Sequence, residues 1–272
     1  MMSKNELSKK ITVVVIGYDD YKDIWPYFTY FYRLSGLNDN LKTVFVSAFE
    51  QGPEEFTSIT ANSFSAGERI KAAINFSNTD YYLILLEDYI IFDNVNFESI
   101  RQYLEFVINE KCDYLCLYNF ISHLKGQKFK KLSGFSVGKI HKNRNYRINL
   151  QPSIWSKKLL INVLNNDPQT LWDLENSLNY NDDFDNVDAL YVKKSKFKVI
   201  NFVDKGYLTL KAKNLIKKHH LDILKRKTIP FSIHFKHKLK NFLVSLCPDS
   251  LLKKYLNHKS KYKNKAKQDR PR

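Results

Sequence analysis

Acidic residues stand directly after two apolar segments that have the character of β-strands. Glu87 and Asp88 end the apolar run 81–86, and Asp19 lies three residues beyond the β-branched run 11–16. In α/β sheets ligands bind beyond the carboxyl ends of the strands, where such carboxylates accept hydrogen bonds from a base or a ribose. The alternative for the Glu-Asp pair is a solvated turn, and the alternative for Asp19 is a loop or helix-cap role.

The glycine pattern after the first run limits the chemistry further. Gly17 lets the backbone turn sharply at the end of that run. No Gly-x-Gly-x-x-Gly follows it, and the chain contains no Gly-Lys-Ser/Thr loop. The sequence therefore argues against a dinucleotide enzyme and against a P-loop phosphotransferase.

The elements that must position these acids alternate between strand and helix. We expect strands over 11–16, 41–49, 81–86 and 114–118, separated by helices over 25–34, 66–76 and 97–109. This alternation predicts right-handed crossovers and a mostly parallel sheet with helices on both faces, which is an α/β fold.

The positive charge of the chain is concentrated at one end. Residues 1–210 contain 25 Lys and Arg against 25 Asp and Glu, whereas residues 211–272 contain 19 against 3, and this difference accounts for the whole net charge of +16. We therefore expect a neutral body followed by a basic extension whose partner is an anionic surface.

The apolar residues of this extension indicate which surface that is. After Pro230, apolar residues recur with a helical period, with lysines between them: Phe231, Phe235, Leu239, Phe242, Leu243 and Leu246. Such an amphipathic basic helix predicts a peripheral membrane anchor, followed by a disordered basic tail over 261–272. The alternative is that the helix packs on the body, and nucleic acid is the less favoured partner because no binding motif is present.

Three segments of the body resemble the nucleotide-sugar glycosyltransferases of the GT-A fold, particularly the family-2-like enzymes of bacterial capsule and lipopolysaccharide biosynthesis. They are Val-Val-Val-Ile-Gly-Tyr-Asp at 13–19, the pair 64–69 and 82–88, and the pair 150–155 and 172–175. The resemblance covers about residues 11 to 210. It implies a Rossmann-like, GT-A-like sheet and transfer of a sugar from a nucleotide-sugar donor.

The first two segments imply the donor side of the site. By this resemblance the donor-binding residues are Gly17, Tyr18, Asp19, Gly67, Arg69, Glu87 and Asp88. Such enzymes hold a Mg²⁺ or Mn²⁺ ion on an acidic motif, because hard cations prefer oxygen ligands. Asp88 is the expected metal ligand, with Glu87 as a possible second, but Tyr89 or Ile90 stands where a second acid is expected. A reaction without metal therefore stays open.

The third segment implies the base and the acceptor side. Glu175 is the expected catalytic base of an inverting transfer, since a Glu close to the aromatic surface of Trp172 can have a raised pKa. In a retaining reaction it would orient the acceptor, and as a first-turn acid of a helix it would have no chemical role. Gln151, Trp155 and Trp172 are the expected acceptor contacts, and a core position is the alternative for Trp155.

These expectations combine into a membrane-associated enzyme with three parts. They are a transferase domain over 1–210, a basic helical extension over 211–260 and the tail 261–272. The expected acceptor is a lipid-linked or lipopolysaccharide glycan at the cytoplasmic face of the membrane, and the three cysteines fit a reducing compartment. The rivals are a sugar nucleotidyltransferase and a non-catalytic membrane- or nucleic-acid-binding module on the same fold.

Overall fold

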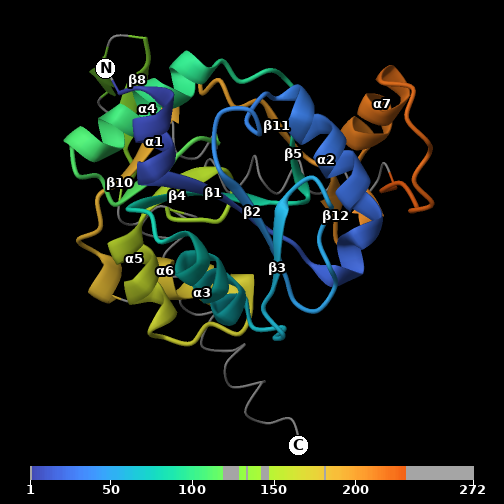
Figure 1. Ribbon diagram of the computed structural model, residues 1–272, viewed down its shortest axis with the longest axis horizontal. Coiled ribbons are helices and arrows are strands. Elements are labelled where there is room, and N and C mark those ends of the chain that lie inside the picture. Colours follow the sequence, from blue (N-terminus) through green and yellow to red (C-terminus); the bar gives the residue numbers. More distant parts are fainter. Residues whose placement is uncertain (1, 119–128, 133, 142–146, 181, 231–272) are drawn as a thin grey trace, which may run out of the picture.

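The computed structural model describes residues 2–118, 129–132, 134–141, 147–180 and 182–230. Its centre is a nine-stranded mixed sheet in the order β3-β2-β1-β4-β9-β6-β10-β8-β7, with helices on both faces (Figure 1). Only β8 and β9 run against the other strands of this sheet. The predicted mostly parallel, Rossmann-like α/β fold is therefore confirmed.

One half of the sheet is built from four parallel strands. They are β1 (Ile11–Ile16), β2 (Thr43–Ser47), β3 (Thr57–Thr60) and β4 (Tyr81–Leu86). Strand β1 is paired on both sides and buried throughout: Val13 and Val15 face one core, and Val14 and Ile16 face the other. This explains its continuous β-branched sequence. The predicted strands 11–16 and 81–86 are confirmed to the residue, while β3 was not predicted.

The other half of the sheet contains a strand that the sequence did not reveal. Strand β9 (Ser153–Ser156) lies antiparallel between β4 and β6 (Tyr114–Cys116), with Ile154 opposite both Leu83 and Leu115. The sheet continues through β10 (Ala189–Lys193), β8 (Ser136–Lys139) and β7 (Phe129–Lys131). The chain therefore returns to the centre of the sheet after its first parallel half.

The helices form two layers on the sheet. One layer packs on the first core and contains α1 (Lys4–Lys10), α2 (Trp25–Leu34), α4 (Phe97–Asn109) and α7 (Leu210–Lys218). The other contains α3 (Ala66–Ser77), α5 (Lys157–Leu164) and α6 (Leu171–Tyr180). The predicted helices over 25–34 and 97–109 are confirmed, and α3 extends one residue beyond its predicted end.

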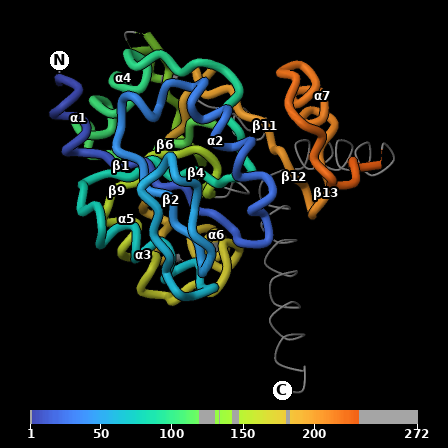
Figure 2. The backbone as a smooth tube through the Cα atoms, turned by 45° about the vertical axis from the view of Figure 1, so that its right-hand side comes forward, coloured from blue at the N-terminus to red at the C-terminus, as the bar shows by residue number. Residues whose placement is uncertain are grey.

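Short strands connect the sheet to the last described helix. Strand β5 (Tyr89–Ile91) pairs with β11 (Val199–Asn201), and β12 (Val203–Asp204) pairs with β13 (Tyr207–Leu208). Helix α7 follows this hairpin at the side of the body (Figure 2). Ala212, Ile216 and Leu224 are buried in the first core, so the body extends beyond residue 210 to include the first part of the expected extension.

The predicted membrane helix after Pro230 and the predicted disordered tail lie outside the described residues. In the part of the chain that the structure describes, no helix combines the length and apolar character needed to cross a membrane.

Candidate functional site

The carboxyl ends of β1 and β4 form one side of the candidate site. Ile16 pairs with Leu86 at the last position of both strands, so the residues that follow each strand emerge side by side. The Tyr18 N–H donates to the Glu87 carboxylate (2.9 Å). A side chain at Gly17 would overlap the ring of Phe45, which explains the glycine. The structure thus brings together the two acidic strand ends that the sequence singled out.

Arg69 and Glu87 lie beneath these strand ends. Each is only 4% exposed, and the Arg69 Nη1 donates to the Gly17 carbonyl (2.5 Å). Burial, together with the neighbouring charge of Asp88, raises the pKa of Glu87 well above its usual range, while the Arg69 guanidinium acts against that rise. The two side chains therefore hold the strand ends in place from within the body.

Asp88 is the acid that remains available at this edge. Its Oδ1 is buried and makes no hydrogen bond within the described residues. Burial raises the pKa of Asp88 to about 7, and the negative charge of Asp204 on β12 adds to the rise. Asp204 was missed by the sequence analysis because it is more than 100 residues away and belongs to a two-residue strand.

The donor set at this position fits a hard divalent cation. An unpartnered buried carboxylate oxygen with a second carboxylate nearby is what Mg²⁺ uses when waters and phosphate oxygens complete its coordination. Among the described residues no group of three or more His, Cys, Asp or Glu side chains could hold a metal by itself. Asp88 and Asp204 would hold the ion, which would neutralise the charge developing on a leaving phosphate.

Asp19 has the loop role that was the alternative to a base or ribose contact. Its carboxylate accepts hydrogen bonds from the backbone N–H groups of Ala48 (3.0 Å), Phe49 (2.8 Å) and Glu50 (3.1 Å). These bonds fix the loop after β2 against the start of the 3₁₀ helix η1 (Asp19–Ile24). Asp19 therefore shapes the edge of the site through this loop.

Gly67 also has a packing role. Its N–H donates to the Pro168 carbonyl (2.9 Å), and a Cβ would come within 3.2 Å of Pro168. The glycine thus lets the start of α3 approach the loop that leads into α6. The predicted donor contact at Gly67 is not the role that these contacts give it.

Glu175 is linked to Asp88 through two hydrogen bonds between residues that are neighbours in the chain. The Leu150 N–H donates to the Glu175 Oε1 (3.0 Å), and the Gln151 Nε2 donates to the Tyr89 hydroxyl (2.8 Å). Burial raises the pKa of Glu175 to about 7, and the hydrogen bond from Leu150 opposes that rise. The structure therefore joins the predicted base and one predicted acceptor residue to the edge that carries Asp88.

The two tryptophans that were predicted to contact the acceptor differ in exposure. Trp155 is 0% exposed on β9, and its Nε1 donates to the Ser153 hydroxyl (2.8 Å). The predicted contact of Trp155 with a sugar is therefore wrong, because its ring is part of the second core. Trp172 is 66% exposed on the first turn of α6, the helix that carries Glu175, and its ring is available to a ligand.

Exposed aromatic rings that the sequence analysis missed lie on the loops after β2 and β3. Phe49 and Phe64 are 50% and 68% exposed, and their rings make an edge-on contact with centroids 4.7 Å apart. Tyr18 is also exposed, after β1. The sequence feature that could have revealed them is an aromatic residue two to four positions beyond the end of a strand. Such rings offer faces on which planar or sugar rings can stack.

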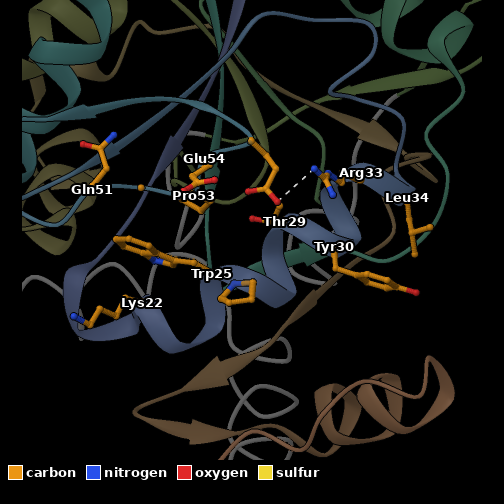
Figure 3. Close-up of a pocket in the computed structure, with 12 residues that line it drawn as sticks. Lys22, Trp25, Thr29, Tyr30, Arg33, Leu34, Gln51, Pro53 and Glu54 are labelled. Carbon is orange, nitrogen blue, oxygen red and sulfur yellow. Dashed lines mark ion pairs between the residues drawn. The ribbon is translucent and has the colours of Figure 1, made fainter.

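A hollow of about 650 Å³ lies next to this edge, between η1, α2 and the loop after β2 (Figure 3). The ion pair between Arg33 and Glu55 (3.4 Å) spans it, and Trp25 and Thr29 line it from α2. The Trp25 Nε1 and the Thr29 hydroxyl are buried without a hydrogen-bond partner in the described residues. This hollow adjoins the loop that Asp19 holds.

No family model and no curated protein sequence matches the chain. Among solved structures, S. aureus TarS 1–349 in complex with UDP-GlcNAc is similar, with 14% identity and a TM-score of 0.40 over 81% of this chain and 68% of that one. A second TarS structure matches with 15% identity and a TM-score of 0.39, over 57% of this chain but only 29% of its own length.

A UDP-glucose pyrophosphorylase complexed with UDP-glucose is similar at 9% identity and a TM-score of 0.42, over 71% of this chain and 93% of that one. These likenesses concern the path of the main chain. The assignment of the fold rests on the order and register of the sheet.

Proposed function

We propose that this protein is a glycosyltransferase that moves a sugar from a nucleotide-sugar donor to an acceptor hydroxyl. The observation that carries the proposal is that two partly buried carboxyl groups, Asp88 and Glu175, are linked at one edge of the sheet by the hydrogen-bonded pairs Gln151–Tyr89 and Leu150–Glu175. One carboxylate suits a metal-bound diphosphate, and the other suits proton transfer near neutral pH.

Each residue then has a defined part in the transfer. Glu175, held by the Leu150 N–H, accepts the proton of the acceptor hydroxyl, and its pKa of about 7 lies close to the working pH. Asp88 and Asp204 would hold a divalent cation, which would supply positive charge to stabilise the leaving nucleoside diphosphate. Gln151 orients the acceptor beside Tyr89, and the exposed ring of Trp172 supports it from α6.

The proposed acceptor is a lipid-linked, lipopolysaccharide or capsule glycan at the cytoplasmic face of the membrane. The basic, apolar sequence over 231–272 supports this location, because such segments bind anionic lipid surfaces. The protein would then act as a peripheral membrane enzyme that meets its acceptor at the lipid surface.

A thermal-shift panel with UDP, GDP, CDP, CMP and ADP, each with and without Mn²⁺, tests the donor site. A ligand at 100 times its dissociation constant stabilises a fold by about 2.7 kcal/mol, which such an assay detects. We expect one nucleotide to stabilise the wild type in the presence of Mn²⁺ and to lose this effect in Asp88→Ala.

The matched control is Asp80→Ala at the opposite end of β4. Asp80 is exposed and pairs with Lys10 (2.8 Å), so its loss removes the same charge without touching the candidate site. The control should respond to the nucleotide as the wild type does. Absence of any nucleotide response in the wild type would contradict the proposed function.

A further inference from the structure

A second hollow, of about 630 Å³, lies beyond the candidate site on the small sheet of β5 and β11. Helix α7 forms one wall, and β11 with the residues just before it forms another. Lys211, Asn214 and Lys218 line it from α7 at spacings of three and four residues, so they share one face of the helix. The proposed transfer reaction uses none of these side chains.

The charges around this hollow are predominantly positive. Lys198, Lys211 and Lys218 line it, and the facing acid is Asp93, which pairs with Lys198 (2.5 Å). The positive charge of Lys218 also contributes to lowering the pKa of Asp93, after the hydrogen bonds from Lys198 and Asn94. In the described part of the chain Lys211 and Lys218 form no ion pair, so two of the three cations are left for a ligand.

The floor of the hollow is apolar and aromatic. Phe197 and Leu215 are almost completely buried, and Phe92 and Ile200 line the hollow between them. A ligand that satisfies both surfaces needs an anionic group for the lysines and an apolar part for the floor. An inorganic anion alone would leave the floor unused, and a neutral glycan would leave the lysines unused.

The hollow is connected to the candidate site through neighbouring rings and one strand. Tyr118 lines it and meets the ring of Tyr89 edge-on, with centroids 6.1 Å apart. Tyr89 begins β5 beside Asp88, and Phe92 follows the end of that strand. Three residues of extended chain separate them, which is about 10 Å.

We propose that this hollow binds the phosphate group of an acceptor whose phosphate is joined to a hydrocarbon chain. Lys211, Lys218 and Asn214 hold the phosphate oxygens, and the aromatic floor receives the first part of the chain. This inference rests on the proposed function and names its acceptor as a lipid phosphate. Strand β5, which is about 10 Å long, then separates the hollow from Tyr89, near which Glu175 would receive the proton of the reacting hydroxyl.

Binding of octyl phosphate to the full-length protein, followed by calorimetry, tests this inference. The probe carries both the phosphate and the chain, whereas octyl glucoside carries only the chain and inorganic phosphate only the anion. The double variant Lys211→Glu, Lys218→Glu should weaken octyl phosphate binding at least about tenfold, which is a loss of about 1.4 kcal/mol.

The matched control is the double variant Lys213→Glu, Lys217→Glu on the same helix. Both lysines are exposed and neither lines the hollow, so the change in net charge is identical. The control should bind octyl phosphate as the wild type does. An equal loss in both double variants would show general attraction to a basic helix and would overturn the proposal.

Two further comparisons distinguish binding of a lipid phosphate in this hollow from binding of a hydrocarbon chain alone and from attraction to an anionic lipid surface. Binding of octyl glucoside as tight as that of octyl phosphate overturns it, and so does binding only to vesicles that contain phosphatidylglycerol. A nucleotide response measured on the same samples reports on the proposed function independently. If the nucleotide binds and octyl phosphate does not, the acceptor assignment fails while the transferase proposal stands.

Discussion

Replacing Glu175 by Gln separates the energetic cost of its partly buried carboxyl group from its proposed chemistry. Glutamine keeps the shape of the side chain and an oxygen that can accept the Leu150 N–H, but it cannot ionise. In the folded protein burial raises the pKa of Glu175 from its ordinary value of 4.5 to about 7. Each pKa unit corresponds to about 1.4 kcal/mol, so the whole difference is about 3 kcal/mol.

The sign of the pH effect follows from proton binding. Between pH 4.5 and 7 the unfolded chain loses the Glu175 proton while the folded protein keeps it, so the free energy of unfolding of the wild type decreases as the pH rises. The Gln variant lacks this contribution, and the other acids are common to both proteins. The stability of Glu175→Gln relative to the wild type should therefore rise by about 3 kcal/mol from pH 4.5 to above 7.

Urea unfolding at a series of pH values measures this difference, and glycosyl transfer measured on the same preparations reports the chemistry. If Glu175 is the base, the variant should lose about 100- to 10,000-fold in kcat. The wild-type rate should also rise with pH to a plateau above about 7. Glu68→Gln, at an exposed acid on α3, is the matched control. A stability difference between Glu175→Gln and the wild type that does not change with pH would refute the reasoning.

Three further substitutions test other parts of the protein. Asp19→Ala leaves three backbone N–H groups of the loop after β2 without their carboxylate and should destabilise the protein by about 2 kcal/mol in chemical unfolding, whereas an unchanged midpoint would show that water replaces it. Trp155→Ala should cost about 3 to 5 kcal/mol of stability because it opens a cavity in the second core. Trp172→Ala should change stability by less than about 0.5 kcal/mol and instead raise the KM for the acceptor, and an unchanged KM would remove Trp172 from the site.

Three strands of the parallel half, β1, β2 and β4, were predictable because each is an almost completely buried apolar run, whereas β3 is partly exposed and was not predicted. The run 11–16 has partners and a core on both sides, so its sequence is continuously apolar and its limits are visible. Strand β9 has only four residues, with two large apolar side chains between two serines, a pattern that also occurs in loops. Its position between β4 and β6 depends on contacts more than 35 residues away, which periodicity does not report.

The candidate site was predictable to the extent that it follows strand ends. Asp88 was found because an acid after a buried strand lies at the ligand edge, and Glu175 was found through a family resemblance. Asp204 and Phe64 were missed, since their importance comes from the loops that carry them back to this edge. Asp19 was found, but its three hydrogen-bond donors lie about 30 residues further along the chain, so the residues around Asp19 do not reveal them.

The antiparallel direction of β9 has a consequence for how such a protein can diversify. Because β9 runs against β4, the chain enters it at the edge where β4 ends, and Ser153 pairs with Ile84 just before the acidic pair. The residues just before β9, Leu150 and Gln151, therefore lie at this edge and bond to Glu175 and Tyr89, while the pairing of Ile154 with Leu83 keeps the register of the strand. Under the proposed function, exchange of Gln151 in a descendant would change the acceptor side of the site and leave the ends of β1 and β4 unchanged.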